Sequence, residues 1–157
     1  VADEGVHVSR LHGGGQPSPL FPGAKQTLRR LAERDYLLAV ATGKSRRGLQ
    51  RAFDESGLEP LFQATRCADE TFSKPHPQML QEILTDLDTE PTAAVVVGDT
   101  EYDMQMAGNA GVAAVGVSHG VHSTERLIAH GALQCFENLG DLAAWLVSPG
   151  REHEEVR

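Results

Sequence analysis

The sequence predicts an α/β domain in which a parallel β-sheet is covered by helices on both faces, giving three layers. Short apolar runs such as YLLAVAT (36–42) and AAVVVG (93–98) are typical of strands that are buried on both faces. Each run is followed by a stretch in which apolar residues recur at helical spacing. The two patterns alternate about five times, as they do in folds built from strand–helix–strand units.

The boundaries of these elements follow from capping and breaking residues. Pro22 suits the start of the first helix, whereas Ser45 and Gly57 suit the start and the end of the second. Helices are expected over residues 22–35, 45–57, 77–87, 101–111, 124–131 and 141–147. Strands are expected over residues 36–42, 62–68, 93–98, 113–118 and 132–136.

The domain organisation is expected to be simple, because 157 residues suit one domain with a substantial core. We assign residues 20–147 to that core. Residues 1–19, which include HGGGQPSP, are interpreted as a linker or as the remnant of a preceding segment. Residues 148–157 end in REHEEVR and are interpreted as a disordered, solvated tail.

The charge and the composition exclude several classes of protein. A formal net charge of −8 argues against nucleic acid or an anionic membrane as the main partner. No apolar run approaches the roughly 18 residues of a membrane span, and the polar first residues do not resemble a signal peptide. Cys67 and Cys135 match no zinc or CxxC spacing and are expected to be reduced thiols in the cytoplasm.

Polar side chains follow the predicted strands at the points where chemistry is expected in such a sheet. Thr42 and Gly43 end one strand, Asp99 follows another, and Lys74 precedes a helix. Asp103 lies four residues after Asp99. The two carboxylates suit Mg²⁺, which takes one or two of them together with water and phosphate oxygens. The Thr42 hydroxyl, the Gly43 N–H and the Lys74 ammonium suit those phosphate oxygens.

Residues 19–146, which contain these positions, resemble the haloacid dehalogenase superfamily of hydrolases, and more narrowly its phosphoglycolate phosphatase-like group. LLAVATGKS resembles the second motif of the family, which makes Thr42 a phosphate ligand. SKPHP resembles the third, which makes Lys74 the charge-balancing lysine. GDTEYD resembles the fourth, which makes Asp99 a metal ligand and Asp103 a second ligand or a neighbour of one.

The resemblance implies a Rossmann-like sheet and a magnesium-dependent phosphomonoester hydrolase that forms an aspartyl-phosphate intermediate. It also implies a small phosphorylated metabolite as the substrate, with phosphoglycolate as a guess. The metal-independent dehalogenase branch is a minor alternative. Helical caps select the leaving group in this family, and no cap follows the expected position here.

The first motif of the family, DxDxT at the end of the first strand, is absent before LFPGAK. Its aspartates are the nucleophile and the general acid–base in the resembled enzymes. A near match, DLDT with its threonine one position early, occurs from Asp86 to Thr89. That match continues an amphipathic helix rather than a buried strand, so we interpret it as a coincidence.

The resemblance places the missing strand between the strands that end at Thr42 and Asp99, where two open edges would invite pairing with another chain. Three outcomes are possible: GVHVSRLH fills the place, another chain fills it by self-association, or the sequence is part of a longer enzyme. The last is favoured. The chain alone is therefore expected to be inactive, and restoring the natural upstream sequence is expected to rescue it.

Other interpretations remain open at these residues. Thr42 alone would close a strand by bonding its own backbone, and acids at a helix start complement the helix dipole. Lys44, Arg46 and Arg47 form a basic cluster that suits either a solvated face or an anionic substrate. Without a nucleophile, the chain is alternatively a non-catalytic phosphate- or metal-binding module or an assembly subunit.

A second enzyme class is suggested by two fragments. HGGG at residues 12–15 matches an oxyanion-hole signature, and a G-x-S-x-G pattern surrounds Ser118, with Asp141 and His153 following in the order of an esterase triad. The predicted helix begins near Thr124 rather than at the serine. We therefore treat the esterase as a minor alternative.

Overall fold

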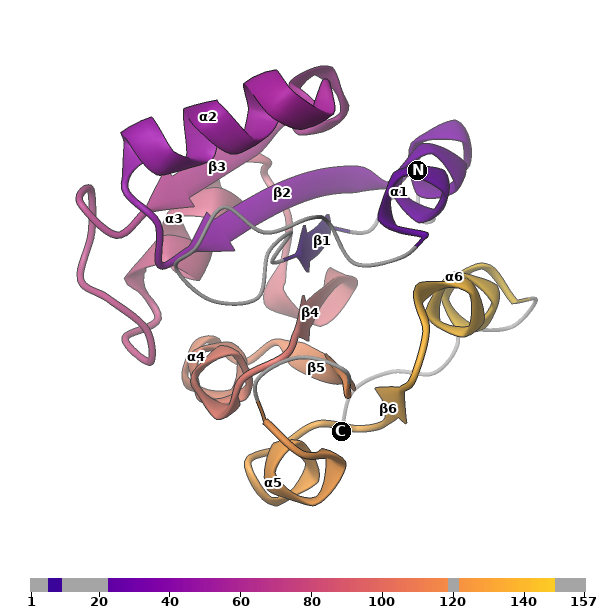
Figure 1. Ribbon diagram of the computed structural model, residues 1–157. Helices are drawn as coiled ribbons and strands as arrows, with labels where there is room; N and C mark the ends of the chain where they lie inside the picture. The colour runs from indigo at the N-terminus through magenta and orange to yellow at the C-terminus, as the bar shows by residue number, and fades with distance from the viewer. Residues whose placement is uncertain (1–5, 10–22, 119–121, 149–157) are drawn as a thin grey trace.

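The computed structural model describes residues 6–9, 23–118 and 122–148. Six strands form one sheet in the order β3-β2-β1-β4-β5-β6, and every neighbouring pair is parallel (Figure 1). Helices cover both faces of this sheet. The predicted α/β fold class is confirmed.

The observed elements lie within two to three residues of the predicted ones, apart from β1, which had only been a possibility. The strands are β1 Val6–Ser9, β2 Leu37–Thr42, β3 Ala64–Cys67, β4 Ala94–Gly98, β5 Ala113–Val117 and β6 Cys135–Phe136. The helices are α1 Ala24–Glu33, α2 Arg46–Ser56, α3 Gln78–Asp86, α4 Glu101–Ala110, α5 Thr124–Ala129 and α6 Leu139–Val147. Two 3₁₀ turns, η1 Glu59–Leu61 and η2 Pro91–Ala93, complete the set.

Each face of the sheet has its own apolar core. On one face α1, α2 and α6 contribute leucines and Phe53, and on the other α3, α4 and α5 contribute leucines, methionines and Ile83 (Figure 1). In β2, Leu38 and Val40 join the first core whereas Ala39 and Ala41 join the second, because successive side chains of a strand point to opposite faces. Burial on both faces explains the unbroken apolar runs of the sequence.

The caps of α2 agree with the sequence analysis. Ser45 Oγ accepts a hydrogen bond from the backbone N–H of Gly48 at 3.1 Å. Gly57 ends the helix with φ of 71°, a left-handed conformation that glycine adopts without a steric penalty. These two residues fix where the chain turns from the edge that carries Thr42 back towards β3.

The central place of the sheet is filled by β1, which pairs with β2 on one side and with β4 on the other. This is the first of the three outcomes that the sequence left open. Residues 6–9 are therefore a strand of the core rather than part of a linker, which corrects the interpretation of residues 1–19 at these positions. The expected open edges of β2 and β4 are paired. A strand therefore occupies the central place, but it does not carry the DxDxT motif of the resembled family.

The remaining parts of the predicted linker and tail, residues 1–5, 10–19 and 149–157, lie outside the described residues. Among the helices in the described ranges, none has the length and apolarity needed to cross a membrane.

Candidate active site

Thr42 and Asp99 lie at the carboxyl edge of the sheet, where α/β folds bind their ligands. Thr42 is the last residue of β2, and Asp99 follows β4 directly. Both are buried, with exposed fractions of 4% and 1%. Burying a carboxylate is costly unless it is paired or binds a metal. The burial of Asp99 therefore indicates that specific contacts or a metal ion hold its carboxylate.

The register of the sheet brings these two residues to the same level. Ser9 of β1 aligns with Val97 of β4 and, by extension of the β1–β2 register, with Val40 of β2. Thr42 and Asp99 each lie two residues beyond this row. They are two strand spacings apart, or about 10 Å between Cα atoms. Val40 and Val97 pack in the same core, so the alternation of side chains also puts Thr42 and Asp99 on one face.

The Thr42 side chain makes the local hydrogen bond to the backbone that is expected of a threonine closing a strand. Its Oγ1 accepts a hydrogen bond from the backbone N–H of Lys44 at 3.1 Å. This bond uses an acceptor site of the hydroxyl and not its O–H donor. Beside it, Gly43 is exposed, and a Cβ added there would meet no atom within 4 Å. The turn therefore leaves open space beside Gly43, the residue that follows Thr42.

Lys74 reaches the same edge through Asp103. Its Nζ lies 2.5 Å from Asp103 Oδ1, and the two side chains are only 9% and 2% exposed. The other carboxylate oxygen of Asp103 accepts hydrogen bonds from the N–H and the hydroxyl of Thr100, at 3.2 and 2.9 Å. Thr100 and Asp103 together form a capping box at the start of α4. Asp103 thus links the Lys74 loop to the helix that follows Asp99.

Gly98 allows this helix start to lie against the end of β4. A Cβ at residue 98 would be 2.4 Å from Asp103 Cβ and 2.6 Å from Asp103 Oδ2. Only a residue without a side chain permits this approach. The last residue of the strand is therefore part of the architecture that holds Asp99, Asp103 and Lys74 together.

Glu101, the other acid in the first turn of α4, has partners of its own. It pairs with Arg126 and with His130 Nε2, the latter at 2.8 Å. The hydrogen bond from Arg126 lowers the pKa of Glu101. His122 accepts a hydrogen bond from Glu101 N at Nδ1 and donates its backbone N–H to the carbonyl of Asp99, at 2.9 and 3.3 Å. These contacts fix the backbone from the carbonyl of Asp99 to the N–H of Glu101.

The residues at this edge fit a magnesium ion held by Asp99. Mg²⁺ is satisfied by one or two carboxylates, with water and phosphate oxygens completing its shell. Asp99 offers a buried carboxylate at the end of a central strand. Asp103 is the second predicted ligand, and its oxygens here contact Lys74 and Thr100. Asp103 therefore binds Lys74 and Thr100 in this structure, and metal binding by Asp99 and Asp103 stays a prediction.

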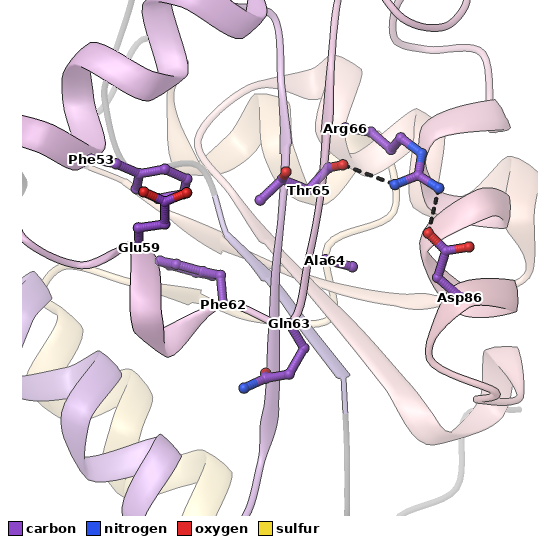
Figure 2. A pocket seen from close by; sticks show the side chains of 8 residues that line it. All are labelled: Phe53, Glu59, Phe62, Gln63, Ala64, Thr65, Arg66 and Asp86. Carbon is purple, nitrogen blue, oxygen red and sulfur yellow. Dashed lines mark hydrogen bonds and ion pairs between the residues drawn. The ribbon is translucent and has the colours of Figure 1, made fainter.

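A pocket of about 310 Å³ lies away from this edge, along the outer side of β3 (Figure 2). It reaches Ala64, the first residue of the strand, whereas Thr42 is level with Cys67, the last. The Arg66 guanidinium on its wall is bound by Glu82 and Asp86. Because this cation is already neutralised and the pocket is at the amino end of the strand, we do not place the reaction there.

The side chains of Cys67, Asp69 and Glu70 form a group whose possible metal-ligand atoms lie within 4.8 Å of one another. Both oxygens of Glu70 contact the Arg46 guanidinium, and Asp69 accepts a bond from the Arg46 backbone. Burial raises the pKa of the Cys67 thiol to about 11, so this thiol is protonated at neutral pH. The group is therefore organised around an arginine. Nothing in the local sequence indicated the pairing of Arg46 with Glu70.

The two motif coincidences have structural explanations. Asp86 is the last residue of α3 and pairs with Arg66, away from the carboxyl edge. The helix after Ser118 begins at Thr124, and the backbone N–H of Ser118 donates to the carbonyl of Phe136. Asn138 caps α6, because its Oδ1 accepts a hydrogen bond from the backbone N–H of Asp141 and its Nδ2 donates to Asp141 Oδ2. The esterase fragments HGGG and His153 lie outside the described residues.

Residues 8–117 match the profile of the family described as haloacid dehalogenase-like hydrolase. The chain belongs to the haloacid dehalogenase-like hydrolases. This family membership confirms the resemblance read from the second, third and fourth motifs.

Individual relatives within the haloacid dehalogenase-like family agree. The chain is 37% identical to the probable phosphatase IndB of Dickeya dadantii over 114 residues, which cover 72% of the chain and 50% of that protein. It is 36% identical to the phosphoglycolate phosphatase of Haemophilus influenzae over 104 residues, which cover 66% of the chain and 46% of that protein. The chain thus spans about half the length of these relatives.

Structural similarity gives the same fold. The crystal structure of a predicted phosphoglycolate phosphatase from Haemophilus somnus superposes with a TM-score of 0.75 and 27% sequence identity. The superposition covers 81% of this chain and 57% of that one. The sheet of the chain is therefore the core sheet of a haloacid dehalogenase-like hydrolase.

Proposed function

We propose that this chain is the phosphate- and metal-binding core of a magnesium-dependent phosphomonoester hydrolase. One observation carries the proposal: Thr42, Lys74 and Asp99, from three separate segments, lie at one edge of the sheet. The family and the phosphatase relatives support it. A small phosphorylated metabolite is the proposed substrate, and the similarity to a phosphoglycolate phosphatase makes phosphoglycolate one candidate.

Each residue at this edge has a proposed task. The Thr42 hydroxyl and the Gly43 N–H bind phosphate oxygens, and the Lys74 ammonium balances the charge that develops on them. Asp99 holds the magnesium ion, and Asp103 orients Lys74. When bound, Mg²⁺ supplies positive charge that neutralises and orients the phosphoryl group. The local charge thus attracts an anion to a protein whose formal net charge is −8.

The proposed reaction passes through an aspartyl-phosphate, formed when a carboxylate attacks phosphorus and the ester oxygen leaves. The segment that fills the central place offers no such nucleophile, because residues 6–22 contain neither Asp nor Glu. We therefore expect the 157-residue chain to bind phosphate without hydrolysing an ester.

The test measures binding and turnover in parallel. Inorganic phosphate with Mg²⁺ is expected to raise the melting temperature of the chain, whereas either alone has a smaller effect, because ligands stabilise the state that binds them. Asp99→Asn is expected to remove the effect of Mg²⁺. Asp88→Asn makes the same chemical change at an exposed position and serves as the matched control.

Turnover separates the alternatives. Hydrolysis of p-nitrophenyl phosphate is expected only from a form whose central strand carries the aspartates of the DxDxT motif, and the Asp99→Asn change should abolish it there. A pure binding module would show Mg²⁺-dependent stabilisation without turnover in either form. Metal-independent cleavage of p-nitrophenyl acetate would instead support the esterase and overturn the proposal.

A further inference from the structure

Two loops carry the proposed phosphate-binding groups, and the structure joins them. The loop between β2 and α2 follows Thr42, and the loop between β3 and α3 contains Lys74. The backbone N–H of Ala68 in the second loop donates to the carbonyl of Lys44 in the first, at 2.9 Å. A direct main-chain contact therefore spans the two segments.

Arg46, the first residue of α2, adds side-chain and main-chain contacts between the two loops. Its Nε and Nη2 donate to the two carboxylate oxygens of Glu70, at 2.9 and 2.8 Å. Its own backbone N–H donates to Asp69 Oδ1 at 3.0 Å. Two parallel bonds between a guanidinium and a carboxylate fix orientation as well as distance. The main chain and the side chain of Arg46 thus bind Asp69 and Glu70, two successive acids of the loop between β3 and α3.

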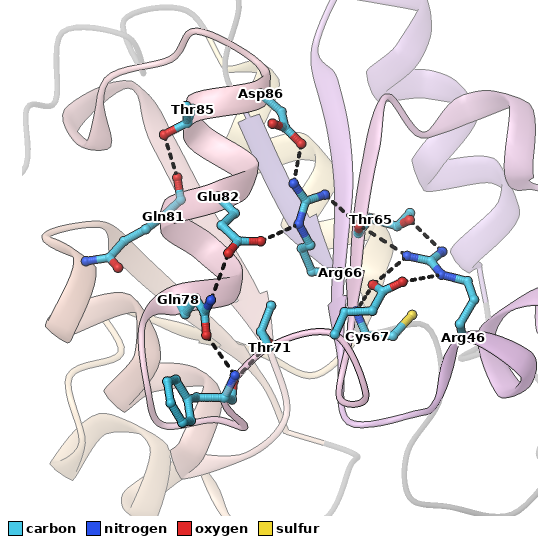
Figure 3. A network of polar contacts seen from close by, with 12 residues as sticks. Arg46, Thr65, Arg66, Cys67, Thr71, Gln78, Gln81, Glu82, Thr85 and Asp86 are labelled. Carbon is cyan, nitrogen blue, oxygen red and sulfur yellow. Dashed lines mark hydrogen bonds and ion pairs between the residues drawn. The ribbon is translucent and has the colours of Figure 1, made fainter.

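The partners of Arg46 are themselves held in place (Figure 3). Arg46 Nη1 donates to Thr65 Oγ1 at 2.8 Å, and the backbone N–H of Cys67 donates to Glu70 Oε1 at 2.9 Å. The hydrogen bond from Arg46 lowers the pKa of Glu70, so the carboxylate is ionised at neutral pH. Cys67 is the register partner of Thr42, which puts this cluster beside the end of β2.

We propose that Arg46 is a positioning residue, which by binding Glu70 and Asp69 holds the Lys74 loop in register with the Thr42 loop. Lys74 lies four residues after Glu70 in the same loop, and its ammonium group is bound by Asp103 of α4. The loop is therefore anchored on both sides, at α2 and at α4. This inference rests on the proposed function, because holding the two loops in register matters for binding only if both loops contact the same phosphate.

A purely structural alternative makes a different prediction. β3 is one of the two edge strands of the described sheet, and the carbonyl of Thr65 accepts hydrogen bonds from both Arg46 and Arg66 (Figure 3). Arginines along an edge strand protect it from pairing with other chains. If edge protection were the only role of Arg46, replacing Arg46 and replacing Arg66 would have the same consequences.

The experiment compares Arg46→Lys with Arg66→Lys in the full chain. Lysine keeps the charge but not the two-bond fork. Calorimetric titration with inorganic phosphate at saturating Mg²⁺ is expected to show affinity about tenfold lower for Arg46→Lys, a typical effect of losing a group that orients ligands. Arg66→Lys is expected to leave the affinity unchanged. Glu70→Gln is expected to match Arg46→Lys, and the double variant to lose no more than either alone.

Amide hydrogen exchange provides a second readout that does not need phosphate. The Ala68 amide, which bonds across to the Lys44 carbonyl, is expected to exchange faster in Arg46→Lys than in Arg66→Lys. Equal phosphate affinities in these two variants, or unchanged exchange at Ala68, would overturn the positioning role. Failure of the unsubstituted chain to bind phosphate would overturn the proposed function, and the exchange at Ala68 would still decide whether Arg46 orders the second loop.

Discussion

Replacing Lys74 by methionine is expected to lower the free energy of unfolding by about 3–5 kcal/mol, the usual cost of removing one partner of a buried ion pair. Methionine keeps most of the apolar stem of lysine but not its ammonium group. It leaves the Asp103 carboxylate, 2% exposed, with Thr100 but without its cation. Urea denaturation of the variant beside the unsubstituted chain measures the difference.

The controls for Lys74→Met separate the pair from the loss of a charge. Lys25→Met removes an exposed lysine from α1 and is expected to change stability by less than about 0.5 kcal/mol. Lys74→Met combined with Asp103→Asn removes both charges and is expected to recover much of the loss. A loss below about 1 kcal/mol in Lys74→Met would show that the contact contributes no more than a surface pair.

Gly98→Ala is the second change with a large expected effect, a loss of about 3 kcal/mol in the free energy of unfolding. The added methyl group would lie 2.4 Å from Asp103 Cβ, and the rigid end of β4 cannot move away from it. The first turn of α4 must therefore shift. Because Asp103 moves with that turn, the Lys74 pair is expected to weaken, and the variant is expected to bind Mg²⁺ and phosphate less tightly.

Gly108→Ala is the matched control for Gly98→Ala. Gly108 lies in α4, and a Cβ added there would meet no atom within 4 Å. Alanine is a better helix former, so this change is expected to raise stability by about 0.5–1 kcal/mol. If both glycine variants had the stability of the unsubstituted chain, the close approach of α4 to β4 would not be a requirement of the fold.

The fold was predictable because its signals are local. Apolar runs, Ser45 and Gly57 each report on their own stretch of chain, and together they give the alternation of strands and helices. The place of β1 was harder to predict. Four residues between a polar start and a glycine-rich stretch carry little periodic signal, so the sequence left open what pairs with β2 and β4.

At the candidate site, the sequence predicted which residues reach the carboxyl edge but not their contacts. A local signal for Asp103 did exist: Thr100 followed three residues later by an acid is the pattern of a capping box. Its pairing with Lys74 spans 29 residues of sequence, and the Arg46–Glu70 pair spans 24. Such pairs depend on the register of the sheet, which local patterns do not encode.

The central claim is that Thr42, Lys74 and Asp99 surround one divalent ion and its phosphate. Mn²⁺ in place of Mg²⁺ tests it most directly, because this paramagnetic ion broadens the NMR signals of nearby amides. With inorganic phosphate present, the amide signals of Gly43, Lys74 and Thr100 are expected to broaden first, and Asp99→Asn is expected to prevent this. Broadening centred instead on Asp69 and Glu70, and retained in Asp99→Asn, would contradict the account.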